Sequence, residues 1–473
     1  MTASPLSNTA KKLILFTVSL ALFMDVLDSN IINTSIPAIS RTFQVNPIDL
    51  KIALLSYLMS LAIFIPTSGW AADKYGAKRI FISAFGIFIT SSFFCGYAHS
   101  LAELVIARSF QGVGAAFMLS LGRLTIARTF KRHELVEAMN AVVIVVSVAV
   151  MLGPFVGGVI TEYLSWPWIF WVNIPIGLMA MVLARYTLKD TAPKKTRPFD
   201  LLGFILFGGS LALLCFSLSE LSESQVNIHA IVTLICISLL MFLLYVFHAQ
   251  RKAHPLIQTR LLLIRTFQVS VLGNICARLG FGGMPFLLPL LQQVGLGYSA
   301  DLSGLLLAPM AFGIIFSKLF TLKILRITGY RQYLLINTVL VAVILWSFQI
   351  INVHTSAFTI ACLSFVFGVG ISAQFNGMNS LAFADIREDD LSASTSITST
   401  VQIISQSFGV AAGAILLRYY SSFSNQPSSL TINVFHQTFF TMGIITLLSS
   451  LIFMRLRSGD GEQMLKAQAD QIE

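Results

Sequence analysis

The chain has 473 residues, of which 56% are hydrophobic and 11% are charged, and its mean hydropathy is +0.80. This composition is too apolar for a soluble enzyme of the same length, so it predicts a polytopic membrane protein. The net charge of +10 would fit a nucleic-acid partner, but the positions of the charges indicate membrane orientation instead, as described below.

The first apolar stretch, residues 13–37, is long enough to span a bilayer, yet it contains Asp25 and Asp28. Residues three apart share one face of a helix. An ionised Asp at the membrane centre costs at least ~2.5 kcal/mol, so such a pair normally faces a bundle interior or a water-filled cavity. The two acids are either a structural polar pair or a proton or substrate site of a transporter. We favour the second, because repulsion between like charges suits a group that takes up and releases a proton.

Hydropathy divides the chain into about fourteen candidate spans of roughly 18 to 27 residues. They begin near Leu13, Lys51, Ile80, Leu101, Leu135, Pro167, Leu201, Asn227, Thr266, Leu302, Gln332, Ala357, Ala393 and Val434. No connection is long enough for a soluble domain, and no nucleotide-binding loop of the form Gly-x-x-x-x-Gly-Lys-Ser/Thr is present. The expected energy source is therefore not ATP hydrolysed by this chain.

The basic residues are distributed unevenly between the two sides of the predicted membrane protein. With a cytoplasmic N-terminus, 24 of the 31 Lys and Arg residues fall in even-numbered loops or at the termini. Three lie on the other side and four lie inside spans, in this order: Arg41, Lys51 and Arg418, then Arg108, Arg123, Arg278 and Lys318. The asymmetry follows the positive-inside rule, so it predicts two cytoplasmic termini and no nucleic-acid partner.

The cysteines and histidines predict no disulfide, metal or catalytic site. All five cysteines fall inside apolar spans without paired spacing, and the seven histidines are scattered, mostly at span ends. The first span has no small-residue cleavage site and is too long for a signal peptide, so we expect it to remain as a membrane anchor.

The turn after the second span, residues 69–79, has an acid framed by glycines and cations. Gly69 and Gly76 would permit close helix approach and a tight reversal. Asp73 could form a charge latch with Lys78 or Arg79 that breaks when helices rock. Ordinary snorkelling charges would explain the cations, but not the Gly-x-x-x-Asp-x-x-Gly frame.

Two later spans in the first half also carry candidate functional residues. Arg108 lies about eight residues from the outer end of the fourth span, or ~12 Å deep, which matches the depth of Asp28 and predicts a buried ion pair. In the fifth span, Gly153 and Pro154 place a helix breaker mid-span, and Gly157 and Gly158 remove side chains from one face. We expect a kinked and closely packed helix there, although a simple packing notch remains the alternative.

The expected substrate contacts come from both halves. Arg278 falls about twelve residues into the ninth span, near the midplane, where snorkelling is difficult. Arg123 and Lys318 lie nearer the cytoplasmic ends of their spans, where snorkelling or structural pairing is the alternative to substrate binding. The other candidates are uncharged side chains of a kind that also joins membrane helices structurally: Asn33, Gln111, Gln374 and Asn376.

Five stretches resemble motifs of the major facilitator superfamily. They are the loop signature at 69–79, the arginine motif at 108–115, the antiporter motif at 153–158, and the first-helix and sixth-helix motifs at 27–37 and 168–177. The last two are similar to the fourteen-helix drug:proton antiporter branch. Ala149 and Pro167 depart from the pattern, where the branch usually has glycine and arginine.

Within that branch the chain is similar to the MdtD-type multidrug exporters. This narrower resemblance rests on residues 68–70, 122–125, 277–280 and 284–286 and on Lys318.

The resemblance implies an all-α major facilitator fold with two six-helix halves and two additional helices. The expected divisions are a first half at 1–200, the additional pair and linker at 201–255, and a second half with a short cytoplasmic tail at 256–473. It also implies a proton-coupled, multidrug-efflux-like exporter in a bacterial inner membrane. Proton coupling falls to Asp25, Asp28 and Arg108.

The charges inside the spans leave a second function open. Four cations against Asp25 and Asp28 suit an anionic substrate, such as an organic acid or a carboxylate siderophore, carried outward or inward. In either case we expect a monomer that is not an enzyme, needs no cofactor beyond the proton gradient, and has a small-molecule substrate, protons and lipid as its partners.

Overall fold

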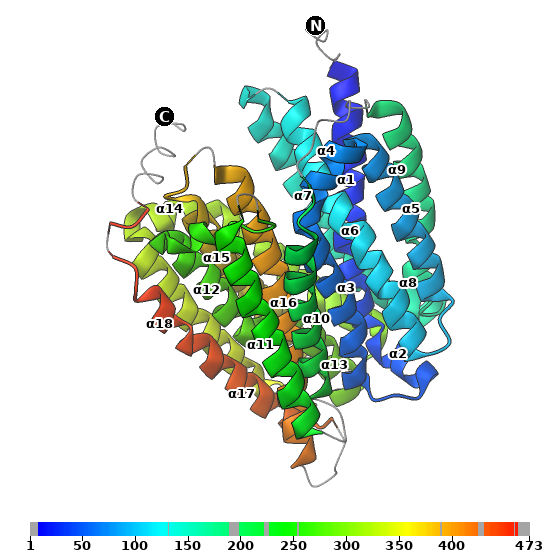
Figure 1. Ribbon diagram of the computed structural model, residues 1–473. Helices are drawn as coiled ribbons and strands as arrows, with labels where there is room; N and C mark the ends of the chain where they lie inside the picture. The colour runs from blue at the N-terminus through cyan, green and yellow to red at the C-terminus, as the bar shows by residue number, and fades with distance from the viewer. Residues whose placement is uncertain are drawn as a thin grey trace, which may run out of the picture.

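The computed structural model describes residues 8–130, 132–188, 198–221, 227–252, 255–387, 390–423, 430–457 and 459–461. The expected C-terminal tail after residue 461 lies outside these ranges. Within them every regular element is a helix, as the sequence predicts (Figure 1).

The first bundle contains nine α-helices (Figure 1). They are α1 (Asn8–Ile31), α2 (Ile36–Phe43), α3 (Lys51–Phe64), α4 (Ser68–Tyr75), α5 (Ala77–Gly96), α6 (Leu101–Thr129), α7 (Arg132–Tyr163), α8 (Trp168–Trp171) and α9 (Asn173–Thr187). Short 3-10 turns interrupt the chain at η1 (Ile32–Thr34), η2 (Pro47–Leu50) and η3 (Ile65–Thr67). Helix α1 packs against α6, α7 and α9, so its two acids lie inside this bundle.

The second bundle follows two intervening helices. Its members are η4 (Thr259–Leu263), α12 (Arg265–Phe281), α13 (Met284–Leu290), the π-helical η5 (Leu291–Gly295), α14 (Ala300–Ser347), η6 (Phe348–Ile350), α15 (Ala357–Phe383), α16 (Leu391–Ser422), α17 (Ile432–Leu448) and α18 (Ser450–Phe453). Helix α12 packs against α15, α16 and α17. Helix α12 therefore packs against three long helices of the second bundle, as α1 does in the first.

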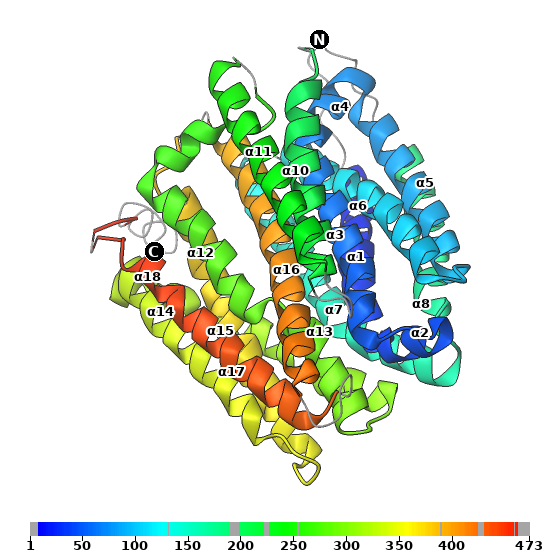
Figure 2. The same cartoon turned by 60° about the horizontal axis from the view of Figure 1, so that its bottom comes forward.

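The two intervening helices, α10 (Leu201–Glu220) and α11 (Ile228–Arg251), pair with each other, and α10 packs on α3 and α16 (Figure 2). Asp200 caps α10 through the Gly203 amide at 3.1 Å and accepts hydrogen bonds from His248 at 2.8 Å and Lys252 at 3.0 Å. Burial alone would raise the pKa of Asp200, but the hydrogen bonds from these partners outweigh it and lower the pKa. The ionised carboxylate thus fixes the ends of α10 and α11 to each other.

Helix length and apolar composition indicate how many times the described chain crosses a membrane. Twelve segments are long and apolar enough to span it, and one of them, residues 300–350, has 51 residues. At 1.5 Å per residue, 51 residues would extend ~75 Å, more than twice a ~30 Å hydrocarbon layer. This segment reverses at Gly329, whose φ of 69° is readily available only to glycine, so it crosses twice. With α1 added, the described residues make fourteen crossings, in agreement with the sequence prediction.

The two bundles meet mainly at one face of the molecule. We call the face where α1 and α12 begin the terminal face, and the face that holds α2, α13 and η5 the opposite face (Figure 1). At the opposite face, Gln293 donates to the Thr34 carbonyl at 2.8 Å, and Glu162 accepts from the Ala300 amide at 3.1 Å. Away from this face, Arg123 of the first bundle donates a hydrogen bond to Ser399 of the second at 3.0 Å.

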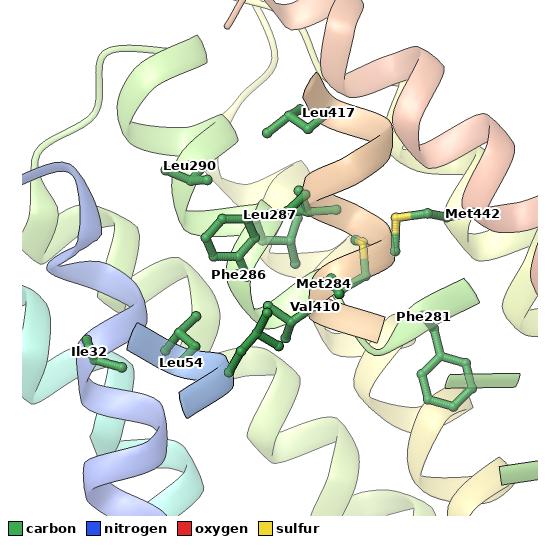
Figure 3. Packing of buried hydrophobic residues seen from close by; sticks show 14 of the residues in the cluster. Ile32, Leu54, Phe281, Met284, Phe286, Leu287, Leu290, Val410, Leu417 and Met442 are labelled. Atoms are coloured by element: carbon green, nitrogen blue, oxygen red, sulfur yellow. The ribbon is translucent and has the colours of Figure 1, made fainter. Parts of the chain in front are cut away.

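A buried apolar cluster seals the same region. Figure 3 shows Ile32 and Leu54 from the first bundle beside Phe286, Leu287 and Val410 from the second. Each of these side chains is at most 5% exposed. The structure is therefore closed at the opposite face.

Candidate functional site

The predicted ion pair between Asp28 on α1 and Arg108 on α6 is present and buried. The two side chains are 0% and 1% exposed, and the Arg108 Nη1 donates to Asp28 Oδ2. The two residues lie at matching depths in their spans, and they meet because α1 and α6 are neighbouring helices in one bundle.

Two amide side chains complete the coordination of Asp28. Gln111 Nε2 and Asn173 Nδ2 donate to Asp28 Oδ1 at 2.9 and 2.8 Å. The Gln111 carbonyl oxygen also accepts from Arg108 Nη1 at 2.7 Å. Gln111 is fully buried in this network and supports the ion pair; its role as a substrate contact stays a prediction.

Tyr57 on α3 connects the second acid to the ion pair. Its hydroxyl donates to Asp25 Oδ1 at 2.5 Å, and its ring lies 4.1 Å from the Arg108 guanidinium carbon. Asp28 contacts Arg108 directly, and Asp25 is connected to Arg108 through Tyr57. Neither Tyr57 nor Asn173 was predicted as a functional residue. For Asn173 the signal was its place in the sixth-helix motif, whereas Tyr57 has no distinguishing pattern around it.

Arg278 lies in the last turn of α12 without an acidic partner among the described residues. Its Nη1 donates to Gln406 Oε1 at 3.0 Å, and its guanidinium carbon lies 4.8 Å from the Phe375 ring centre. The Nε atom is buried with no hydrogen-bond partner. The carbonyl dipoles at the helix C-terminus and the aromatic face offset only part of the charge.

Close backbone packing holds Arg278 in place. Gln406 Nε2 donates to the Gly282 carbonyl at 2.9 Å, directly after α12 ends. A methyl group on Gly282 would come within 3.3 Å of the Gly409 Cα atom. The break after α12 is thus pressed against α16, which orients the Gln406 amide toward Arg278.

The other predicted cations have different surroundings. Arg123 is exposed, yet its Nη1 donates at 3.0 Å to Ser399 of the other bundle, so it faces the space between the bundles rather than lipid. Lys318 is exposed on α14 and makes no hydrogen bond or ion pair with any described residue.

The remaining uncharged candidates are mostly buried. Gln374 is fully buried, accepts a hydrogen bond from Asn337 at 2.8 Å and donates one to Thr338 at 3.0 Å, so it joins α15 to α14; its substrate contact stays a prediction. Asn33 is 6% exposed beside the seal at the opposite face. Asn376 is half-buried and donates to Ser372 at 3.4 Å, and it alone of the uncharged candidates retains partial access.

The predicted latch has a different partner. Asp73 accepts from Arg128 of α6 at 3.3 Å, with both side chains about 40% exposed, and it forms no described ion pair with Lys78 or Arg79. Gly76 adopts φ 93° at the end of α4 and permits the predicted reversal. Gly69 has open space where its Cβ would lie, so the expected close helix approach there is wrong.

The glycines of the fifth span pack closely, as predicted. A methyl group on Gly153 would lie 2.7 Å from the Asn30 Cβ, and one on Gly157 would lie 2.6 Å from the Thr34 hydroxyl. One on Gly158 would lie 3.0 Å from the Asp301 Cα of the other bundle. Pro154 lies inside the continuous α7, and its carbonyl accepts from the Thr34 hydroxyl at 3.2 Å.

The described residues contain no group of three His, Cys, Asp or Glu side chains that could hold a metal ion. Carboxylates such as those of Asp25 and Asp28 can take up and release protons, and guanidinium groups such as those of Arg278 and Arg123 can bind negative charge.

Comparison with known proteins identifies the family. Residues 18–410 match the model of the Major Facilitator Superfamily. The "Putative multidrug resistance protein MdtD" of Klebsiella pneumoniae (strain 342) is 33% identical over 443 residues, which cover 93% of this chain and 94% of that protein. Its namesake from Escherichia coli O157:H7 (strain EC4115 / EHEC) is 32% identical over the same shares.

Solved structures show the same fold. A bacterial homolog of the human lysosomal transporter Spinster superposes with a TM-score of 0.68 at 13% identity, covering 97% of this chain and 98% of that one. A D-xylose-proton symporter gives a TM-score of 0.67 at 14% identity, covering 95% and 99%. The chain belongs to the major facilitator superfamily.

Proposed function

We propose that the chain is a proton-coupled secondary transporter that exports small molecules across a bacterial inner membrane. The observation that carries this proposal is the buried ion pair of Asp28 and Arg108, with Asp25 linked to it through Tyr57. The relatives that share a third of its sequence are named as multidrug resistance proteins, which supports efflux of drug-like compounds.

Protonation of Asp28 would change the whole network. The ionised carboxylate accepts from Arg108, Gln111 and Asn173. A proton on Asp28 removes the charge that Arg108 pairs with, so the guanidinium must find other partners or water. The protonated and ionised sites therefore favour different arrangements of α1 and α6, as coupling requires.

The proposed topology places the terminal face in the cytoplasm. The support is the excess of Lys and Arg on that side of the sequence. A fluorescent protein fused after residue 473 should then be bright in cells, while a periplasmic phosphatase fused there should be inactive. The reverse pattern would contradict this orientation.

Asp28→Asn tests the proton site. In inverted vesicles, the variant should lose pH-gradient-driven uptake of labelled substrate by at least ~100-fold, because the amide cannot release a proton. Energy-independent exchange of substrate should continue. Glu137→Gln, which removes an exposed carboxylate of α7, is the matched control and should transport normally. Full gradient-driven uptake by Asp28→Asn protein would refute the assignment.

A second candidate function is transport of an anionic metabolite, and Arg278 favours it. A midplane guanidinium keeps its proton and needs a counter-charge, which no described residue supplies. Arg278→Ala should then fold normally and lose ~10-fold or more in affinity for an organic acid, as expected for ~1.5–3 kcal/mol from one charge-assisted hydrogen bond.

The same variant separates the two substrate classes. If the substrates are lipophilic cations, removing Arg278 should leave their efflux unchanged or improved. Arg278→Lys should restore acid transport only in part, because an ammonium cannot bind a carboxylate in the bidentate geometry. Intact acid export by well-folded Arg278→Ala protein would end the anion proposal.

A further inference from the structure

A stripe of polar side chains runs along one face of α16. Ser399, Gln402 and Gln406 follow the i, i+3, i+7 spacing of a single helix face, and all three are partly exposed. Their partners come from three other helices: Arg123 on α6, Asn379 on α15 and Arg278 on α12. The stripe therefore faces protein on several sides, including the other bundle, rather than lipid.

An arginine lies at each end of this stripe. Arg123 Nη1 donates to Ser399 and Arg278 Nη1 donates to Gln406, each at 3.0 Å. The two acceptor residues are seven positions apart, which separates them by ~10 Å along the helix. Gln402 lies between them, and its amide nitrogen donates to Asn379 at 2.6 Å.

Both guanidinium groups are bound here by uncharged side chains. Among the described residues, neither Arg123 nor Arg278 forms an ion pair, and Asp25 acts on Arg123 only through space. One Arg278 nitrogen is buried with no partner. Two incompletely compensated cations of fixed charge thus lie along one face of α16, one from each bundle.

We propose that the space along α16 binds an elongated organic dianion, with one anionic group on Arg278, the other on Arg123 and the middle of the molecule along Gln402. This inference rests on the proposed anionic substrate and specifies its shape. A monoanion leaves one arginine without a counter-charge, and a compact dianion is too short to reach both. Because the site takes one charged contact from each bundle, a bound dianion also bridges the two halves.

The test measures binding without a proton gradient, using purified protein in nanodiscs. Succinate, adipate, suberate and sebacate provide dianions of increasing length, and octanoate is the monoanion matched to suberate. We expect the wild-type protein to bind suberate or sebacate ~10-fold or more tightly than succinate or octanoate, as one additional charge-assisted contact supplies.

Variants of the two arginines assign the effect. Arg123→Gln and Arg278→Gln should each reduce suberate affinity to the level of octanoate, while octanoate affinity changes only about twofold because one arginine remains. The double variant should bind neither. Arg185→Gln, which removes an exposed arginine at the end of α9, is the matched control and should bind as wild type. Arg123→Lys and Arg278→Lys keep the charge and should retain a weaker preference for long dianions, which excludes loss of folding as the cause.

Two results would overturn the inference. One is the absence of a length preference in wild-type protein. The other is an equal loss of suberate and octanoate in each single variant. If no dicarboxylate binds while Asp28-dependent efflux of dyes persists, the dianion site fails and proton-coupled export stands. If the length preference holds while Asp28→Asn protein keeps full gradient-driven transport, the site stands and the proposed proton coupling fails.

Discussion

The two bundles differ in how a charged side chain inside them is compensated. In the first, Asp28 and Arg108 neutralise each other and two amides satisfy the remaining carboxylate oxygen. In the second, Arg278 has one amide, one aromatic ring and the end of a helix, but no described acid. A closed network responds to a proton, whereas an open cation responds to an anion from outside. Under the proposed function, this difference assigns energy coupling to the Asp28–Arg108 pair of the first bundle and binding of an anion to Arg278 of the second.

The largest expected effect tests whether Arg108 and Arg278 differ in their contribution to the free energy of unfolding. Arg108→Gln leaves Asp28 as a buried charge without its cation, which typically costs about 3–5 kcal/mol. Arg278→Gln leaves no charged partner behind, so it should cost within about 1 kcal/mol. Apparent melting temperatures of the two purified variants in one detergent measure the contrast.

A double variant checks the cause of that loss. Asp28→Asn combined with Arg108→Gln removes both charges and should recover most of the stability that Arg108→Gln loses, because no lone ion remains. Equal destabilisation by Arg108→Gln and Arg278→Gln would remove the distinction between a closed and an open charge site.

Asp25→Asn sharpens the role of the first bundle. Asp25 shares one helix face with Asp28 and reaches the ion pair only through Tyr57. Removing the negative charge beside Asp28 should shift the pH optimum of transport more than it lowers the maximum rate. A pH profile of initial rates in proteoliposomes shows this. An unchanged optimum with a large loss of rate would assign Asp25 directly to proton transfer.

The smallest expected effect concerns the exposed pair of Asp73 and Arg128. A surface ion pair contributes about 0–1 kcal/mol, so Asp73→Asn should slow turnover by about fivefold at most, with substrate affinity unchanged. Arg128→Gln should behave in the same way, and Arg79→Gln should have no effect, because Arg79 does not contact Asp73 in the described structure. Wild-type turnover in Asp73→Asn protein would make the pair an ordinary surface contact.

Hydropathy and charge counting were sufficient to predict the helical fold and its fourteen crossings, because a bilayer sets the length and composition of every span. Depth along a helix was also readable, which is why the Asp28–Arg108 pair could be predicted. Rotation about the helix axis was not readable in spans that are apolar on most sides. Gln111 and Gln374 were therefore assigned to substrate although both face buried networks, and Tyr57 was overlooked.

The latch shows a second limit of sequence reasoning. Asp73 was paired with cations near it in the chain, because sequence distance was the only available guide. The structure instead supplies Arg128, which is 55 residues away on α6. Contacts between separate helices depend on how the bundle is assembled, and no single span contains that information.

Under the proposed transport function, the backbone contact between α7 and α14 would set how far the molecule can open. At Gly158 and Gly304 each helix meets the backbone of the other, near Asp301 and Phe155. Two helices in backbone contact can rotate against each other about the contact point. Helix α7 begins 26 residues before Gly158, or ~39 Å away, so a rotation of ~10° about the contact point moves its far end by ~7 Å. A methyl group at Gly158 would move the contact point between the helices. In the proposed transport cycle, this glycine would therefore limit the angle through which the bundles rotate, although it touches neither charge site.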